Sequence, residues 1–192
     1  CMKMKVGFIG LGIMGRPMAK NLLNAGVELL VSDLNKEAVA DVVAAGAKEA
    51  TYAEIGEQCG RIIIMVPSGA ISKSILFDED GVASTIKEGT VVCDMSSVTP
   101  VESKECYEGL KDKGVGFVDA PVSGGEPGAV AGTLAIIVTS KGEETAEEIE
   151  EELQQFEERL GDKPEITVVY GQIQMLGDHR HLILQLGTEP QG

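Results

Sequence analysis

Hydrophobic and polar positions follow two alternating periods along the first 140 residues of the chain. Short apolar runs, which favour buried strands, are separated by segments whose apolar residues recur every three or four positions, as on one face of a helix. Strands are predicted at 5–9, 28–32, 49–51, 62–66, 90–94, 116–119 and 134–139, and helical segments at 14–25, 36–45, 71–76, 81–86 and 100–113. Strands that alternate with helices are typical of βαβ units, so the pattern predicts an α/β fold with a doubly wound, mostly parallel sheet and helices on both faces.

The last fifty residues have a different pattern. A helix is predicted at 143–160, followed by two runs of period 2 at 166–175 and 181–186 that predict a β-hairpin or two adjacent strands. Residues 141–192 carry 4 Lys and Arg against 13 Asp and Glu, whereas residues 1–140 carry 12 against 18. This change predicts a domain boundary near Lys141, with residues 1–140 as one domain and 141–192 as a tail that completes or extends the sheet.

Composition narrows the class of protein. The chain has 192 residues and a formal net charge of −15, which makes nucleic acid or an anionic membrane an unfavourable partner. No apolar run approaches the roughly 20 residues of a membrane span. The four cysteines show no CxxC spacing, so reduced thiols and a cytoplasmic location are expected, without a metal site.

A glycine-rich segment follows the first predicted strand and opens the first predicted helix. Its sequence, Gly10-Leu11-Gly12-Ile13-Met14-Gly15, fits the G-x-G-x-x-G pattern of dinucleotide-binding (Rossmann) domains. In that pattern the glycines allow a tight turn, close approach of the pyrophosphate and close helix packing. Gly10, Leu11, Gly12, Ile13 and Met14 are therefore predicted to bind the cofactor; the alternative is a glycine turn without a ligand.

Asp33 ends the second predicted strand, 18 residues after Gly15. An acidic side chain at this point can accept hydrogen bonds from the ribose hydroxyls of NAD and repels the 2′-phosphate of NADP. No arginine follows in Leu34-Asn35-Lys36, so NAD is favoured over NADP, with Lys36 as the main reservation. The alternative is that Asp33 serves only as a turn or cap residue.

With these motifs the chain resembles the β-hydroxyacid dehydrogenase family, which includes 3-hydroxyisobutyrate dehydrogenase and tartronate semialdehyde reductase. The resemblance covers residues 3–138 and rests on the segments GLGIMGRPMAKN, DMSSVTP and DAPVSGGEPGA. It implies hydride transfer between NAD and a small hydroxy acid or semialdehyde.

The resemblance also implies site residues. Val66 and Pro67 would line the adenosine-ribose side of the cofactor, and Ser96 with its neighbour Ser97 would approach the nicotinamide. Ser123, Gly124 and Gly125 would hold the carboxylate of a small substrate through neutral donors. The alternative for these glycines is a mobile loop, because Gly-Gly-Glu-Pro-Gly is also a common turn composition.

The family's catalytic lysine, in a G-x-G-x-G-x-x-x-K-x-x-N motif, has no counterpart in this sequence. Spacing from Gly171 puts Arg180 in its place, and an arginine stays protonated and is a poor proton shuttle. The catalytic residue is therefore unknown. Nearby, His179 and His181 have the spacing of two metal ligands, but surface turn histidines are the preferred interpretation.

The family's all-helical second domain is also not found in the sequence. Three explanations compete: a natural relative without the lysine, a truncated chain, and an engineered fusion, which the abrupt change of pattern favours. The first functional hypothesis is cofactor binding with little turnover. The second is a non-catalytic assembly module, in which an unpaired hairpin edge pairs with another copy and forms a homodimer.

Overall fold

The fold is a computed structural model that describes residues 5–139, 167–176 and 179–187. Among these residues ten strands form one sheet. Six of them are parallel and lie in the order β3-β2-β1-β4-β5-β6, which is the order of a doubly wound dinucleotide-binding sheet. The predicted fold class is confirmed. These six strands are β1 Lys5–Ile9, β2 Glu28–Ser32, β3 Lys48–Glu49, β4 Arg61–Ile64, β5 Val91–Asp94 and β6 Gly116–Asp119.

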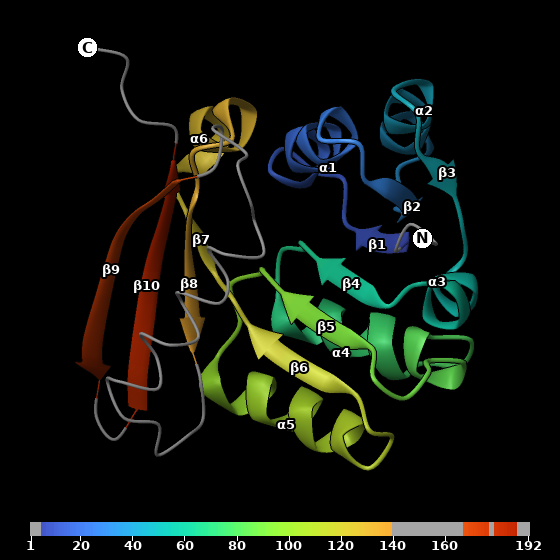
Figure 1. Cartoon of the computed structure of the whole chain (residues 1–192). Helices are drawn as coiled ribbons and strands as arrows, with labels where there is room; N and C mark the ends of the chain where they lie inside the picture. The colour runs from blue at the N-terminus through green and yellow to red at the C-terminus, as the bar shows by residue number, and fades with distance from the viewer. Residues whose placement is uncertain (1–4, 140–166, 177–178, 188–192) are drawn as a thin grey trace.

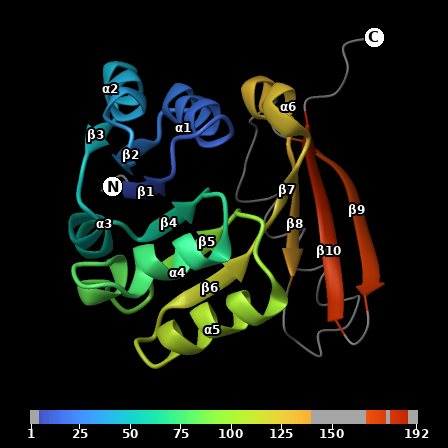
Figure 2. The same cartoon turned by 180° about the vertical axis from the view of Figure 1, so that it is seen from behind.

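Helices cover both faces of the parallel sheet (Figures 1 and 2). Helices α1 and α2 lie on one face, and α3, α4 and α5 lie on the other. A short helix, α6, lies beside α1 at the boundary with the remaining strands. The helices are α1 Gly15–Asn24, α2 Lys36–Ala44, α3 Tyr52–Gln58, α4 Gly69–Phe77, α5 Pro100–Lys111 and α6 Gly125–Ala131, with a 3-10 turn at Val82–Ser84.

The alternation of side chains along the strands creates two hydrophobic cores. Phe8 packs with α1 and α2, whereas the next residue, Ile9, packs with the helices of the opposite face. Leu29 and Leu30 divide in the same way. Successive residues of a strand point to opposite faces, so a continuous apolar run is the pattern of a strand buried on both sides.

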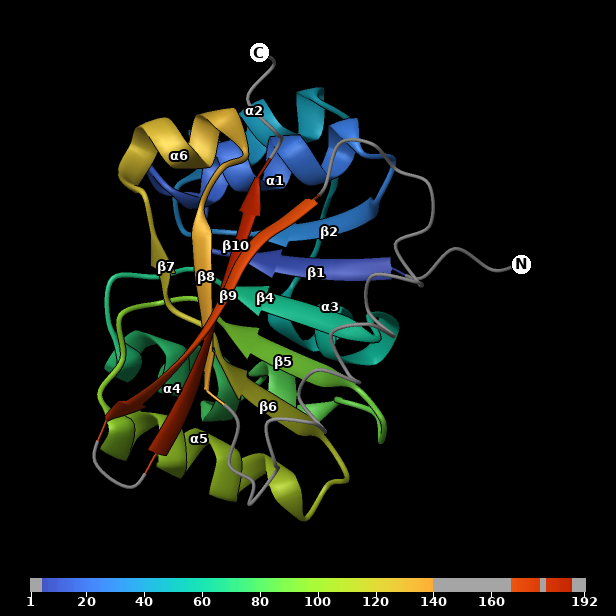
Figure 3. The same cartoon turned by 60° about the vertical axis from the view of Figure 1, so that its left-hand side comes forward.

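Four further strands extend the sheet beyond β6. They are β7 Val122–Ser123, β8 Ala135–Thr139, β9 Thr167–Leu176 and β10 His179–Gly187. Strand β8 is antiparallel to β6, and β10 pairs with β8 on one side and with β9 on the other. Figure 3 shows these strands crossing the direction of the parallel strands at a steep angle. The antiparallel pairing of β9 with β10 confirms the two predicted strands, whereas the division into two domains stays a prediction.

Several sequence-based boundaries are corrected by the structure. The segment predicted as a strand at 49–51 ends at Glu49, and Thr51 instead caps α3. Both α3 and α6 were absent from the prediction. His179 and Arg180 lie in β10 and not in the turn of the hairpin. The helix predicted at 143–160 lies outside the described residues.

Candidate functional site

The turn between β1 and α1 gives its three glycines three different surroundings. Gly10 has φ +100°, and a Cβ on it would lie 2.0 Å from the carbonyl oxygen of Met65. A Cβ on Gly15 would lie 1.8 Å from the carbonyl oxygen of Gly10. A Cβ on Gly12 would meet nothing within 4 Å. Gly10 and Gly15 are therefore required by the fold, whereas the space beside Gly12 is open for a ligand.

Helix α1 begins without a capping side chain. Met14 occupies its N-cap position and makes no side-chain cap hydrogen bond. Within the described residues, the N–H groups of Gly12, Ile13 and Met14 donate to no other protein group. In contrast, side chains cap the four helices α2, α3, α4 and α5; these are Asn35, Thr51, Ser68 and Thr99. Free N–H groups and the positive end of the helix dipole make this terminus suitable for an anionic pyrophosphate.

Asp33 braces the glycine turn. Its Oδ2 accepts a hydrogen bond from the Leu11 N–H at 2.6 Å, and its Oδ1 accepts one from the Asn35 N–H at 2.7 Å. Asp33 therefore has the role in a turn that was the alternative prediction, through Asn35. It also contacts the glycine-rich turn, through Leu11. A carboxylate offers about four lone-pair sites, so two remain available to ribose hydroxyls.

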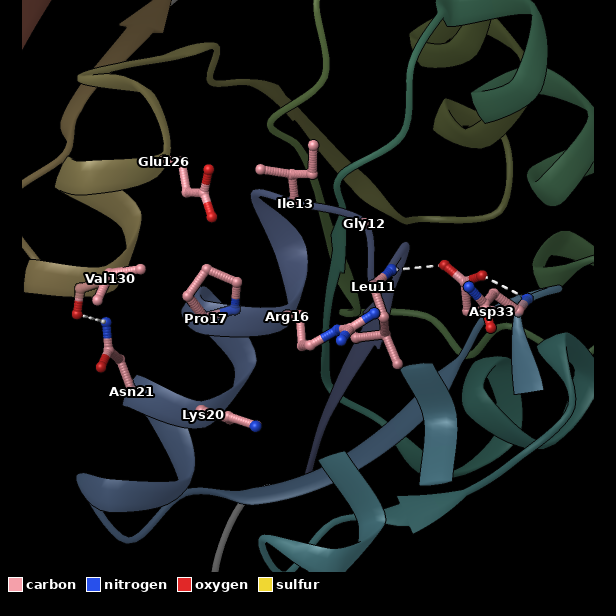
Figure 4. A pocket seen from close by; sticks show the side chains of 11 residues that line it. Leu11, Gly12, Ile13, Arg16, Pro17, Lys20, Asn21, Asp33, Glu126 and Val130 are labelled. Atoms are coloured by element: carbon pink, nitrogen blue, oxygen red, sulfur yellow. Dashed lines mark hydrogen bonds between the residues drawn. The ribbon is translucent and has the colours of Figure 1, made fainter. Parts of the chain in front are cut away.

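A cleft runs along this loop towards α6. Its volume is ≈ 670 Å³, which lies within the usual range of about 300–1,000 Å³ for small-molecule sites. Leu11, Gly12, Ile13 and Asp33 line one end, and Glu126 and Val130 of α6 line the other (Figure 4). The open side of Gly12 and the free N–H groups of α1 border this space, so the residues present fit a bound dinucleotide.

The next predicted residues follow the ends of strands β4 and β5. The Val66 N–H donates to the Ser96 Oγ at 2.9 Å, and the Ser96 N–H donates to the Asp94 Oδ1 at 3.0 Å. Ser96 and Asp94 are fully buried, whereas Ser97 and Pro67 are exposed. Ser96 therefore holds the Val66 loop in place, and Ser97 is the serine of this pair that faces solvent. The contact of Ser96 with nicotinamide stays a prediction.

Ser123, Gly124 and Gly125 lie at the junction of β7 and α6, and all three are exposed. Gly124 has φ +134° and Gly125 has φ +61°, conformations that favour glycine. Helix α6 is fixed to α1 by the Asn21 side chain, whose Nδ2 donates to the Ala129 carbonyl at 2.8 Å. The segment predicted as a substrate site is thus anchored on the helix that borders the cleft. Its carboxylate-binding role stays a prediction.

Arg180 pairs with Met175 in the β10–β9 ladder, which is not the start of a long helix where the family's lysine stands. No group of three or more His, Cys, Asp or Glu with metal-binding geometry occurs among the residues that the structure describes. In the same part of the chain, no helix has the length and apolar character needed to span a membrane.

Sequence reasoning missed three residues at this site. Asp94 accepts a hydrogen bond from the N–H of Ser96, two residues later. Asn21 and Glu49 act through a hydrogen bond and an ion pair with residues distant in the sequence. No local pattern predicts such partners.

The fold and the glycine-rich crevice define a dinucleotide-binding domain of the Rossmann type. Over residues 5–170 the sequence matches the family described as the NAD binding domain of 6-phosphogluconate dehydrogenase. The chain belongs to this family. The cofactor prediction of NAD is confirmed at this level.

Relatives of the β-hydroxyacid dehydrogenase type are similar to the chain, as predicted. It is 44% identical over 135 residues to 2-(hydroxymethyl)glutarate dehydrogenase of Eubacterium barkeri, covering 70% of this chain and 45% of the relative. It is 42% identical over 135 residues to 2-hydroxy-3-oxopropionate reductase of Escherichia coli, covering 70% and 46%. The crystal structure of 3-hydroxyisobutyrate dehydrogenase from Salmonella typhimurium superimposes with a TM-score of 0.66 at 32% identity, covering 70% and 47%. The chain thus spans about half the length of the relatives it matches.

Proposed function

We propose that this chain is the NAD-binding unit of an oxidoreductase that transfers hydride between NAD and a small hydroxy acid or semialdehyde. The observation that carries the proposal is the uncapped start of α1, where Gly12 leaves open space beside unpaired N–H groups. The names of the similar relatives support the substrate class, because they act on small hydroxy acids or on the matching aldehyde.

When bound, NAD supplies the hydride acceptor or donor at its nicotinamide ring. The Gly12, Ile13 and Met14 N–H groups would donate hydrogen bonds to the pyrophosphate, and the Asp33 carboxylate would accept hydrogen bonds from the ribose hydroxyls. Val66 and Pro67 form the wall beside the adenosine ribose. The Ser96 hydroxyl holds that wall in position through the Val66 N–H.

The substrate carboxylate binds at the start of α6. The Ser123 hydroxyl and the N–H groups of Gly124 and Gly125 are neutral donors on a positively polarised helix end, which suits an anion. The Asn21 side chain keeps α6 against α1, so the carboxylate and the cofactor are bound by neighbouring helices.

We further infer that this chain alone turns over slowly. Hydride transfer at a carbinol carbon requires proton transfer at its oxygen, which a lysine performs in the family that the chain resembles. Arg180 stands at that spacing, and its guanidinium keeps its proton at any ordinary pH.

Calorimetric titration and a coupled assay test the two parts of the proposal. NADH is titrated into the wild type and into Asp33→Asn, with Asp112→Asn on the opposite face as the matched control. Micromolar binding that weakens only in Asp33→Asn supports the cofactor site, and an absence of binding contradicts it. NADH oxidation with 2-hydroxy-3-oxopropionate is expected to be very slow; appreciable turnover would refute the inference from Arg180.

One observation favours a second function, assembly of a homodimer. Strand β9 lies at the end of the strand order among the described residues, and edge strands tend to pair with further chains. Light scattering over a range of concentrations is expected to give twice the monomer mass, and a constant monomer mass rejects this function.

A further inference from the structure

An ion pair lies beside the proposed ribose site. Lys36, the first residue of α2, places its Nζ 2.6 Å from the Oε1 of Glu49 at the end of β3. In the sheet Glu49 is the register partner of Val31, two residues before Asp33. The pairing of β2 and β3 therefore places Glu49 at the carboxyl end of the parallel strands, where Asp33 and Lys36 also lie.

The charges of Lys36 and Asp33 act on the same neighbouring side chain. Burial raises the pKa of the Tyr52 hydroxyl, the Asp33 charge raises it further, and the Lys36 charge lowers it. Both charges are thus close to the start of α3, within one small area. An anionic group that binds beside Asp33 would therefore be attracted by the positive charge of Lys36.

The cations around this area are already paired with acids. Arg16 and Lys20 line the cleft with Asp33, and both pair with Asp41 of α2. Between Asp33 and Tyr52 the sequence contains two cationic residues, Lys36 and Lys48. Lys48 lies 3.9 Å from Glu28, which begins β2 at the end of the strand away from Asp33. Lys36 follows Asp33 by three residues, so it is a candidate cation for a 2′-phosphate at the ribose, and its ammonium is already paired with Glu49.

We propose that Glu49 is a second determinant of the preference for NAD over NADP, because its carboxylate holds the Lys36 ammonium that would otherwise bind a 2′-phosphate. This inference rests on the proposed cofactor site. Asp33 disfavours the phosphate by direct repulsion, whereas Glu49 acts by pairing with the Lys36 ammonium. The two acids act by separate routes, so removal of either one improves NADPH binding.

The expected effect is modest because both partners are exposed. The Lys36 and Glu49 side chains are 74% and 51% exposed, so water and salt screen their attraction. Releasing Lys36 is expected to strengthen NADPH binding by about threefold to fivefold at low salt, the upper part of the range of an exposed ion pair. In 1 M salt, where the Debye length is about 3 Å, the gain is expected to fall below about twofold.

The experiment measures dissociation constants of NADH and NADPH by the fluorescence of the reduced nicotinamide, at low and high salt. The variants are Glu49→Gln, Lys36→Gln and the double variant. Glu28→Gln is the matched control, since it removes the same charge and breaks a Lys–Glu pair about 16 Å along the strand from Asp33. Thermal melting confirms that each variant is folded.

The proposal predicts that Glu49→Gln improves NADPH binding and leaves NADH binding within about twofold, and that Lys36→Gln in the same chain abolishes the gain. Equal NADPH affinity in Glu49→Gln and Glu28→Gln, with normal NADH binding, would overturn the role of Glu49 and would leave the proposed cofactor site intact. A gain that persists in the double variant would also overturn the role of Glu49. If the wild type binds no NADH, the proposed function fails, and this inference fails with it.

Discussion

Two glycines of the β1–α1 turn are expected to have different roles: Gly12 leaves space for the ligand, and Gly15 is needed for packing. A methyl group on Gly12 meets nothing within 4 Å, and Gly12 has no positive φ. Gly12→Ala is therefore expected to change the free energy of unfolding by less than about 0.5 kcal/mol, or to raise it slightly. The same methyl group occupies the space beside the free N–H groups of Ile13 and Met14. NADH affinity is expected to fall at least about tenfold, a loss of about 1.4 kcal/mol.

Gly15→Ala provides the contrast, because its methyl group would lie 1.8 Å from the Gly10 carbonyl oxygen. Such overpacking forces the backbone to move and is expected to cost about 1–3 kcal/mol or more, a large part of the roughly 5–15 kcal/mol of a typical domain. Urea denaturation measures stability, and calorimetry measures NADH binding. Equal destabilisation by the two substitutions, or wild-type NADH affinity in Gly12→Ala, would refute this account of the turn.

Three further predictions follow from named contacts. Asp33→Asn is expected to weaken NADH binding about tenfold through loss of a charged acceptor, measured by calorimetry; an unchanged affinity would assign Asp33 to the turn alone. Ser96→Ala leaves the partly buried Val66 N–H without its acceptor and is expected to lower the free energy of unfolding by about 1–3 kcal/mol in urea denaturation, whereas an unchanged stability would show that Ser96 does not hold the Val66 loop. Burial raises the pKa of Cys59 and Cys106 to about 11 and that of Cys93 to about 12. At pH 8 a pKa of about 11 leaves roughly one thiol in a thousand ionised, so these three cysteines are expected to resist iodoacetamide until the chain unfolds, and mass spectrometry showing rapid native labelling would contradict this.

The sequence predicted most of the parallel sheet because most of its strands are apolar runs between polar or glycine-rich turns; β3, which consists of Lys48 and Glu49, is the exception. Strands β1, β2 and β6 have the predicted bounds. Helix α3 was missed although Thr51 and Glu54 form a capping box, because the helix has only seven residues and follows a two-residue strand. Helix α6 was missed because the Gly-Glu-Pro-Gly composition is also typical of a turn.

The cofactor loop was predictable because its geometry depends on residues that are adjacent in the sequence. Gly10, Gly12 and Gly15 require only the local order of strand, turn and helix. The supports around them depend on tertiary structure. Ser96 reaches Val66 across 30 positions, and Asn21 reaches Ala129 across 108. Whether a serine contacts a ligand or braces a loop depends on its burial, and the sequence does not specify burial for two adjacent serines.

The central claim is that NAD binds at the β1–α1 turn of this chain. The most direct test is amide NMR of the ¹⁵N-labelled protein during titration with NADH. We expect the largest shifts at the amides of Leu11, Gly12 and Ile13, with little change at Gly26 and Gly89 in turns away from the cleft. Saturable shifts confined to that loop and its neighbours support the account. Shifts that cluster elsewhere, or an unchanged spectrum at millimolar NADH, would contradict it.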